Sequence, residues 1–193
     1  MDHDDNIVLR GLQYEVDKLL YHWIIFVQVY GSDRKNIEVL RETAGLFFGL
    51  VQSLFLDYLF LTIGKLTEPA KSKIQENVSI ENAIERLSGK IHPKKLEKLK
   101  KDFEKLKVKS RQIKRIRHKY LAHFDKDFMA EMLSGVQLKR GGRKDFDEIL
   151  SLIKKIMNEI EVGFGQDKRH YDALEHNAGN KLMESLKKIV QNA

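Results

Sequence analysis

Hydrophobic positions recur along most of the chain in steps of three and four, the spacing of one face of an α-helix. This pattern predicts helices over residues 7–30, 33–66, 79–88, 93–122, 144–162 and 180–191. The last of them carries Leu182, Leu186 and Ile189 on one face, and we expect these side chains to be buried. No period-two alternation typical of a strand appears. The sequence therefore predicts an all-α fold, a single-domain helical bundle of about six helices, because 193 residues supply one well-formed core.

One stretch of the second predicted helix, residues 45–64, is apolar on nearly every side. Such a stretch is just long enough to span a bilayer. Asp57 near its middle argues against insertion, since a charge at the bilayer centre costs about 3 kcal/mol. A helix that is apolar all round is also typical of the centre of a bundle, so we expect burial in the core and no membrane. Gly45 and Gly49, four residues apart, would let a neighbouring helix approach closely.

The helix predicted over residues 93–122 is strongly basic, and its pattern fits either one continuous helix or two helices broken near Val108. Fourteen Lys or Arg residues lie between Lys90 and Lys119, against three acidic residues. The net charge of this stretch is therefore +11. Because the whole chain has a formal net charge of +7, the remaining residues together carry −4. A phosphate backbone would recognise such a stripe, although a solvated helix face is the alternative interpretation.

Composition places the chain among ordinary globular proteins, with 42% hydrophobic and 33% charged residues. It contains no cysteine, which excludes disulfides and thiolate metal sites and is consistent with a reducing compartment. The N-terminus is acidic and does not resemble a signal peptide. We therefore expect a cytoplasmic protein.

Residues suited to catalysis gather at the end of the basic helix, where Arg117, His118 and His123 lie close together in the sequence. An imidazole can accept and donate a proton near neutral pH. An arginine stays charged and can hold two phosphate oxygens of a transition state. This trio suits cleavage of RNA by attack of its own 2′-hydroxyl on the adjacent phosphate, without a metal ion or other cofactor.

Helical geometry constrains that site. On an ideal helix Arg117 and His123 lie roughly 120° apart around the axis and about 9 Å apart along it. One rigid helix therefore brings them together poorly, whereas two copies across a two-fold axis would bring both pairs to one cleft. Relative to the buried stripe around Ile116, His123 points inward, Arg117 lies at the border and His118 points outward. The alternative interpretation is that His123 is a structural core residue.

The same residues resemble a known family. Arginine, a polar residue directly after it, and histidine four to six residues beyond the arginine are the signature of the HEPN superfamily of helical ribonucleases and nucleotide-binding proteins, which Arg117, His118 and His123 match. Two stretches, Leu66 to Ala70 and Arg117 to Asp125, resemble its AbiU-type abortive-infection branch. Histidine at position 118 departs from that branch, where asparagine is more usual.

This resemblance implies a metal-independent endoribonuclease of a phage-defence or toxin–antitoxin system, working as a homodimer. Arg117 would stabilise the transition state, His123 would act as general acid–base, and His118 would assist or bind phosphate. Neighbouring basic residues would hold the RNA, namely Lys109, Arg111, Lys114, Arg115 and Lys119. An antitoxin or regulatory protein would be a further partner. Two alternatives stay open: a non-catalytic module that binds RNA or nucleotides, and an interaction bundle whose histidines are structural.

Overall fold

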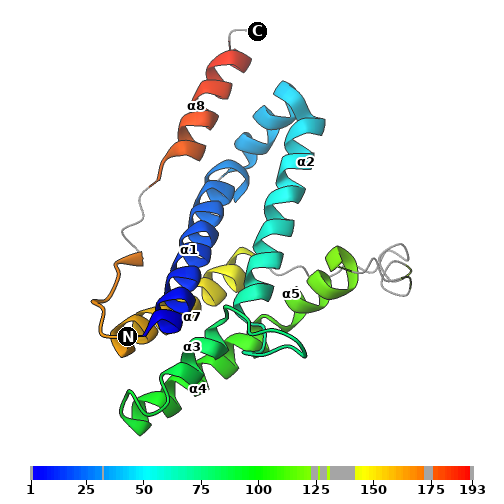
Figure 1. Ribbon diagram of the computed structural model, residues 1–193. Helices are drawn as coiled ribbons and strands as arrows, with labels where there is room; N and C mark the ends of the chain where they lie inside the picture. Colours follow the sequence, from blue (N-terminus) through cyan, green and yellow to red (C-terminus); the bar gives the residue numbers. More distant parts are fainter. Residues whose placement is uncertain are drawn as a thin grey trace.

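The computed structural model describes residues 2–31, 33–122, 126, 130, 142–171 and 176–191, with the backbone only at 120–122. Helices of the described residues pack as an elongated bundle without strands, so the all-α prediction is confirmed (Figure 1). In chain order these are α1 (His3–Phe26), η1 (Val27–Gly31), α2 (Arg34–Leu66), α3 (Ile80–Arg86), α4 (Pro93–Lys109), α5 (Arg111–Ile116), η2 (Arg117–Ala122), α7 (Arg143–Gly163) and α8 (Ala178–Gln191). The two η segments are π-helical.

The core forms where α1 packs against α3, α7 and the end of α2. Asp2 caps α1 by accepting a hydrogen bond from the backbone N–H of Asp5 at 2.7 Å, which satisfies one of the free donors of the first turn. The apolar stripe predicted for this helix is buried. Its fully buried members include Leu9, Leu12, Val16 and Leu19.

Two parts of α2 differ in their surroundings, and we call residues 45–57 its upper half and residues 58–66 its lower half. The lower half lies in the core, where Leu59, Phe60 and Ile63 are each at most 2% exposed. In the upper half Leu46 is 83% and Leu54 67% exposed. The prediction that residues 45–64 form the buried centre of the bundle is therefore wrong for the upper half.

The physical reason is that the upper half extends past the end of the bundle (Figure 1). Its described neighbours are the end of α1, which contacts Phe55 through His22 and Phe26, together with η1, α8 and the beginning of α2. Tyr30 of η1 donates a hydrogen bond from its hydroxyl to the carbonyl oxygen of Phe48 at 3.0 Å. A small second core joins these segments and consists of Val29, Leu40, Met183 and Leu186. No described atom outside Gly49's own part of the helix lies within 4 Å of a Cβ built on it, so the expected close approach of a helix at this glycine is wrong.

The length and composition of α2 alone would allow it to cross a membrane, and among the described residues it is the one helix with this property. Only 28% of its most apolar window is buried. A core helix of a soluble protein can also pass such a test, so length and composition do not decide the matter.

The basic helix divides into α4 and α5 at Ser110, two residues beyond the expected position. Ser110 is fully buried and donates its hydroxyl to the carbonyl oxygen of Leu106 at 2.7 Å. A serine that bonds its own preceding turn bends a helix, which explains why the break falls there. The bend directs α5 and η2 toward the lower half of α2.

Ion pairs fasten α4 to α7. Lys155 of α7 lies 2.7 Å from the carboxylate of Asp102, and Lys109 pairs with Glu148. Burial acts to raise the pKa of Asp102, but the hydrogen bonds and positive charges of Lys155 and Lys105 together outweigh it and leave that pKa below its ordinary value.

The final helix faces the protein differently from the expectation. Leu186 is buried, but Leu182 is 42% and Ile189 59% exposed, so the predicted burial of these two residues is wrong. Met183 takes the inner position instead and is 2% exposed. The reason is that, among the described residues, α8 packs with one side on the end of α1, η1 and the beginning of α2 and leaves its other sides open.

Candidate functional site

Arg117 begins the π-helical turn η2 and lies against the lower half of α2. Its side chain crosses the backbone of Gly64: a Cβ built on this glycine would lie 3.2 Å from Cδ and 3.3 Å from Cγ of Arg117. Such distances are tighter than ordinary van der Waals contact. The absence of a side chain at position 64 therefore makes room for the arginine.

The guanidinium of Arg117 is paired with Glu68, just beyond the end of α2. Its Nη1 lies 2.5 Å from Oε1 of Glu68, and both side chains are 28% exposed. The Nε of Arg117 is buried and has no hydrogen-bond partner. Because a guanidinium has five N–H donors and Glu68 takes one, the pair orients the arginine while leaving donors for an anion.

A second basic side chain reaches the same end of α2. Lys114 donates from Nζ to the backbone carbonyl oxygen of Thr67 at 3.0 Å. A cation is favourable there, because the last carbonyl groups of a helix lack partners and carry partial negative charge. The structure thus brings together the two stretches that carry the family resemblance, Leu66 to Ala70 and the segment beginning at Arg117.

The loop after α2 is held in place by side-chain bonds to its backbone. The amide of Asn77 donates to the carbonyl oxygen of Pro69 at 2.8 Å, and Glu81 accepts from the N–H of Ala70 at 2.9 Å. Ser72 and Gln75 close a turn within it through their backbones at 2.9 Å. This loop forms one wall of a cleft, and it keeps Glu68 close to Arg117.

The cleft has a volume of about 550 Å³ and lies between α1, the end of α2, the following loop and Arg117. Its size falls within the range of small-ligand sites and suits a single nucleotide. Its lining mixes apolar surface with polar and charged side chains, which include Tyr14, Lys65, Glu68, Gln75, Asn77 and Arg117. The ring of Tyr14 is 61% exposed, which leaves an aromatic surface beside the arginine.

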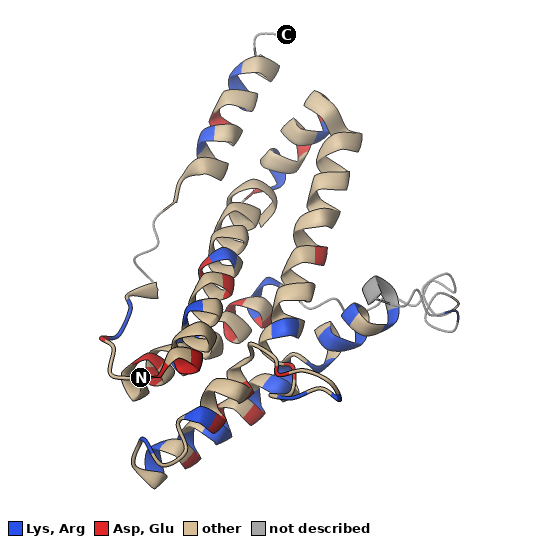
Figure 2. Cartoon of the chain, in the orientation of Figure 1, with Lys and Arg blue, Asp and Glu red and all other residues tan. Residues whose placement is uncertain are grey.

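Lys and Arg residues recur along α4 and α5 (Figure 2), but the residues predicted to bind RNA differ in their contacts. Lys109 is committed to Glu148 on α7, and Lys114 is bonded to Thr67. The remaining three, Arg111, Arg115 and Lys119, lie on α5 and η2, where Lys119 is half-buried and the two arginines are exposed. These three residues lie within six residues of Arg117 in the sequence, on the helical segments α5 and η2 that carry it.

Of the two histidines of the predicted site, the structure describes one. His118 is exposed, as the helical pattern predicts. His123 lies outside the described residues. The convergence of Arg117 with His123 therefore stays a prediction.

Sequence reasoning missed the parts of the site that are far apart along the chain. Glu68 stood within a recognised stretch but no role was foreseen for it, and Gly64 appeared only as one of the residues of an apolar helix. Tyr14 and Asn77 carried no signal at all. Only the fold places these residues beside Arg117.

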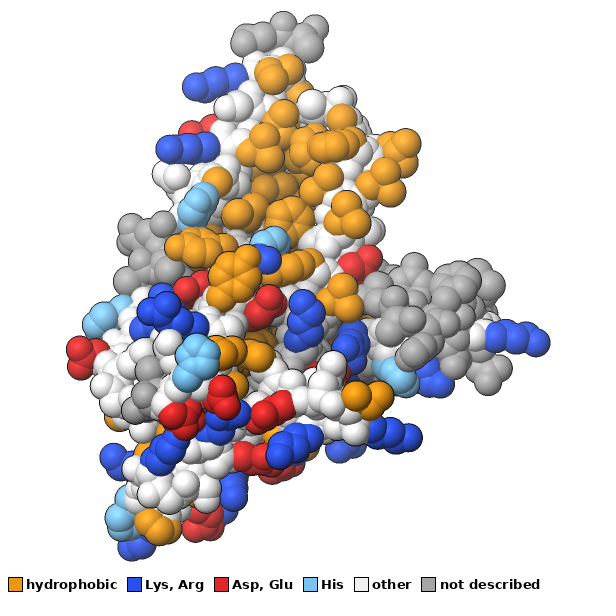
Figure 3. All heavy atoms as spheres, in the orientation of Figure 1, with side chains coloured by type: hydrophobic (Ala, Val, Ile, Leu, Met, Phe, Trp, Pro, Cys, Tyr) orange, Lys and Arg blue, Asp and Glu red, His pale blue; other side chains and the backbone are white. Residues whose placement is uncertain are grey.

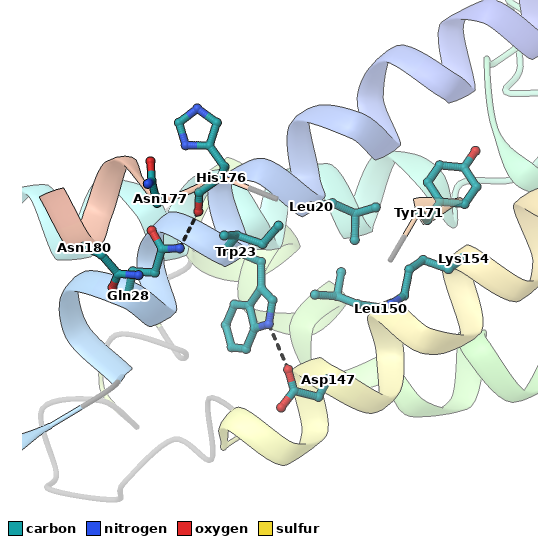
Figure 4. A pocket seen from close by; sticks show the side chains of 11 residues that line it. Leu20, Trp23, Gln28, Asp147, Leu150, Lys154, Tyr171, His176, Asn177 and Asn180 are labelled. Carbon is teal, nitrogen blue, oxygen red and sulfur yellow. Dashed lines mark hydrogen bonds between the residues drawn. The ribbon is translucent and has the colours of Figure 1, made fainter. Parts of the chain in front are cut away.

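A separate cavity of about 750 Å³ lies between α1, α7 and the beginning of α8 (Figure 4). Its polar groups bond to one another: the indole N–H of Trp23 donates to Asp147 at 2.9 Å, and Gln28 donates to the carbonyl oxygen of His176 at 2.5 Å. These bonds are internal to the fold, so nothing in the cavity marks a particular ligand. Within the described part of the chain, no three His, Asp or Glu side chains gather as a metal site requires.

This geometry defines a class of protein: an all-α fold in which an arginine is held in a cleft at the end of a helix. The family model described as AbiU2, a HEPN family, matches residues 5–184. The chain therefore belongs to the AbiU2 family of abortive-infection HEPN domains. Comparisons with individual curated proteins and with solved structures found no match.

Proposed function

We propose that this protein is a metal-independent, cytoplasmic endoribonuclease of a phage-defence or toxin–antitoxin system, active as a homodimer. The observation that carries the proposal is the placement of Arg117: a partly exposed guanidinium fixed between Gly64 and Glu68 at the wall of a nucleotide-sized cleft. Membership of a HEPN family supports it. An antitoxin or regulatory protein would control such an activity.

The proposed reaction follows from the groups that the chain supplies. An imidazole of His123 takes the proton of the RNA 2′-hydroxyl as that oxygen attacks the adjacent phosphorus, and the bond from phosphorus to the 5′-oxygen breaks. The leaving oxygen receives a proton from an imidazolium, which the second copy supplies at a shared site. Arg117 stabilises the charge on the phosphorane oxygens. The products are a 2′,3′-cyclic phosphate and a 5′-hydroxyl.

The other basic residues would hold the substrate. Arg111 and Arg115 of α5 and His118 of η2 are exposed, and Lys119 of η2 is half-buried. Contacts of this kind are made to the phosphate backbone and weaken steeply with salt. Lys114 and Lys109 are bonded to Thr67 and Glu148 within the fold, so contact with RNA would have to displace or share those bonds.

The test uses labelled single-stranded RNA in the presence of a chelator, with the ends of the products identified. Arg117→Ala and His123→Ala should each lower the cleavage rate at least about a hundredfold, the usual loss when a group that stabilises transition-state charge is removed. Arg34→Ala serves as a matched control, since its side chain is 92% exposed on α2 far from the cleft. Equal cleavage by the wild type and His123→Ala, or inhibition by the chelator, would refute the proposal.

The role of Glu68 is tested by Glu68→Gln, which keeps a hydrogen-bond acceptor but removes the charge. We expect kcat to fall because the guanidinium is oriented less firmly, whereas the affinity for RNA should stay the same or rise because a negative charge leaves the cleft. A fall in affinity with an unchanged kcat would contradict a positioning role.

The second candidate function is RNA or nucleotide binding without turnover. Lys109 and Lys114 are bonded to Glu148 and Thr67 within the fold, which favours this candidate over a dedicated RNA groove along the basic helices. It predicts salt-sensitive binding that Arg117→Ala weakens, with no cleavage by the wild type under any condition.

A further inference from the structure

The upper half of α2 exposes an apolar surface that continues into the lower half. Phe47 and Leu50 are each 60% exposed, Leu54 is 67% and Leu61 is 37% exposed. Figure 3 shows hydrophobic side chains gathered over this end of the molecule. Contiguous apolar patches of this kind mark interaction sites on soluble proteins.

The spacing of these residues indicates what covers them. Positions 47, 50, 54, 57 and 61 follow steps of three and four, the repeat by which one helix packs along another. The surface is therefore an open helix face of about four turns, which we call the seam. One polar residue, Asp57, interrupts it, and a single polar position in a seam fixes register.

The seam is complementary to itself. Asp57 and Lys65 lie four residues before and four residues after Leu61, about 40° to either side of it around the helix. If a second α2 packs antiparallel with the two-fold axis at Leu61, the Asp57 of each copy faces the Lys65 of the other. Lys65 is 58% exposed, and its weak pairing with Glu15, at 3.9 Å, leaves it able to turn toward a new carboxylate.

The same arrangement covers a second exposed apolar site. The loop after α2 carries Ile74, which is 97% exposed, and Val78, which is 42% exposed. Leu50 lies 11 residues before Leu61, about 16 Å along the helix, so the upper half of one copy would extend past the end of the other copy's α2. It would then lie over that loop, where apolar side chains meet apolar side chains.

We propose that the occupant of the seam is a second copy of this chain, packed antiparallel about Leu61. The proposal deepens the proposed function, on which its catalytic consequence rests. Lys65, Gln75 and Val78 line the cleft of Arg117, so the upper half of the partner's α2 closes the mouth of this cleft. Each site is then incomplete without the other copy, and the two cleft mouths lie on the same side of the dimer.

The first test uses the absence of cysteine in the chain. Two cysteines form a disulfide only when their Cα atoms lie within about 7 Å, so a single cysteine pairs with its own copy only near a two-fold axis. Under mild oxidation Leu61→Cys should give a covalent dimer. Leu46→Cys should not, although Leu46 is the more exposed of the two at 83% against 37%, because it lies far from the axis. Cross-linking at position 46 without cross-linking at 61 would overturn the proposal.

The second test exchanges the charges. Light scattering should show the wild type as a dimer, and Asp57→Lys and Lys65→Asp should each raise the dissociation constant at least about tenfold, because each places like charges together. The double variant should return to within about threefold of the wild type. A monomeric wild type, or a double variant no better than the singles, would refute the arrangement, and circular dichroism confirms that each variant is folded.

Other occupants are separate outcomes. Binding of the wild type to vesicles of phosphatidylethanolamine and phosphatidylglycerol, lost in Leu50→Asp, would assign the seam to a membrane and overturn the proposal. RNA cleavage by a monomer would overturn this inference but keep the nuclease. A dimer with the predicted cross-link and no cleavage would keep this inference and refute the nuclease.

Discussion

The two halves of α2 have similar apolar compositions and opposite environments. In the lower half Phe60 is 2% exposed and packs against Phe146, while in the upper half Phe47 is 60% exposed. Since the side chains are alike, the difference comes from the neighbours. Helices α1, α5 and α7 surround the lower half, whereas the described neighbours of the upper half are the end of α1 at Phe55 and Leu56, η1, α8 and the beginning of α2. An apolar sequence indicates that a helix packs against another apolar surface, but it does not indicate whether that surface belongs to the same chain.

The largest expected contrast comes from the same substitution in each half. Phe60→Ala should lower the free energy of unfolding by about 3–5 kcal/mol, because it leaves a cavity in the core. Phe47→Ala should change that of the isolated monomer by less than about 0.5 kcal/mol. Denaturant titration at a concentration below the dimer dissociation constant measures both. A similar loss for the two would mean that the upper half is buried within one chain.

A glycine pair gives the next contrast. Gly49→Ala should stabilise the helix by about 0.5–1 kcal/mol, because alanine is the better helix former and the position is open. Gly64→Ala should push the side chain of Arg117 aside by a few tenths of an ångström. We expect RNA cleavage to fall at least about tenfold with little change in thermal stability. Cleavage at the wild-type rate by Gly64→Ala would show that this packing does not position the arginine.

The smallest contrast concerns two threonines that bond the preceding turn of the helix. Thr67 is 1% exposed and donates to the carbonyl oxygen of Ile63 at 2.8 Å, and Thr43 makes the same bond to Val39 on the exposed surface. Thr67→Val should cost about 1 kcal/mol, because a buried hydrogen bond is lost. Thr43→Val should be neutral within about 0.5 kcal/mol. Equal effects in thermal melts would contradict the difference in burial.

Local signals predicted the elements of the fold well. Asp33 and Ser79 cap the beginnings of α2 and α3, and a cap of this kind depends on residues within one turn. Burial was predicted less well, because periodicity gives the face that is apolar and not the element that covers it. The predicted burial of Leu182 and Ile189 on α8 was wrong for the same reason as the predicted burial of the upper half of α2.

The candidate site divides in the same way. Arg117 was identified from its immediate neighbours in the sequence, and the structure places it at a cleft. Its contact with Glu68 joins residues 49 positions apart, and the cleft adds Tyr14 from the first helix. Such contacts depend on how helices pack, which local spacing does not specify.

The π-helical turn at Arg117–Ala122 has a consequence for how this site can change over evolution. A π turn bonds each N–H to the carbonyl five residues earlier instead of four, so it holds one residue more than an α-helical turn would. Losing one residue here would restore ordinary helical bonds and leave the helix intact. It would also rotate everything that follows relative to the arginine. A homologue with such a deletion could therefore keep the fold but lose the arrangement of the site. The length of this turn would then distinguish homologues that keep the site from those that do not.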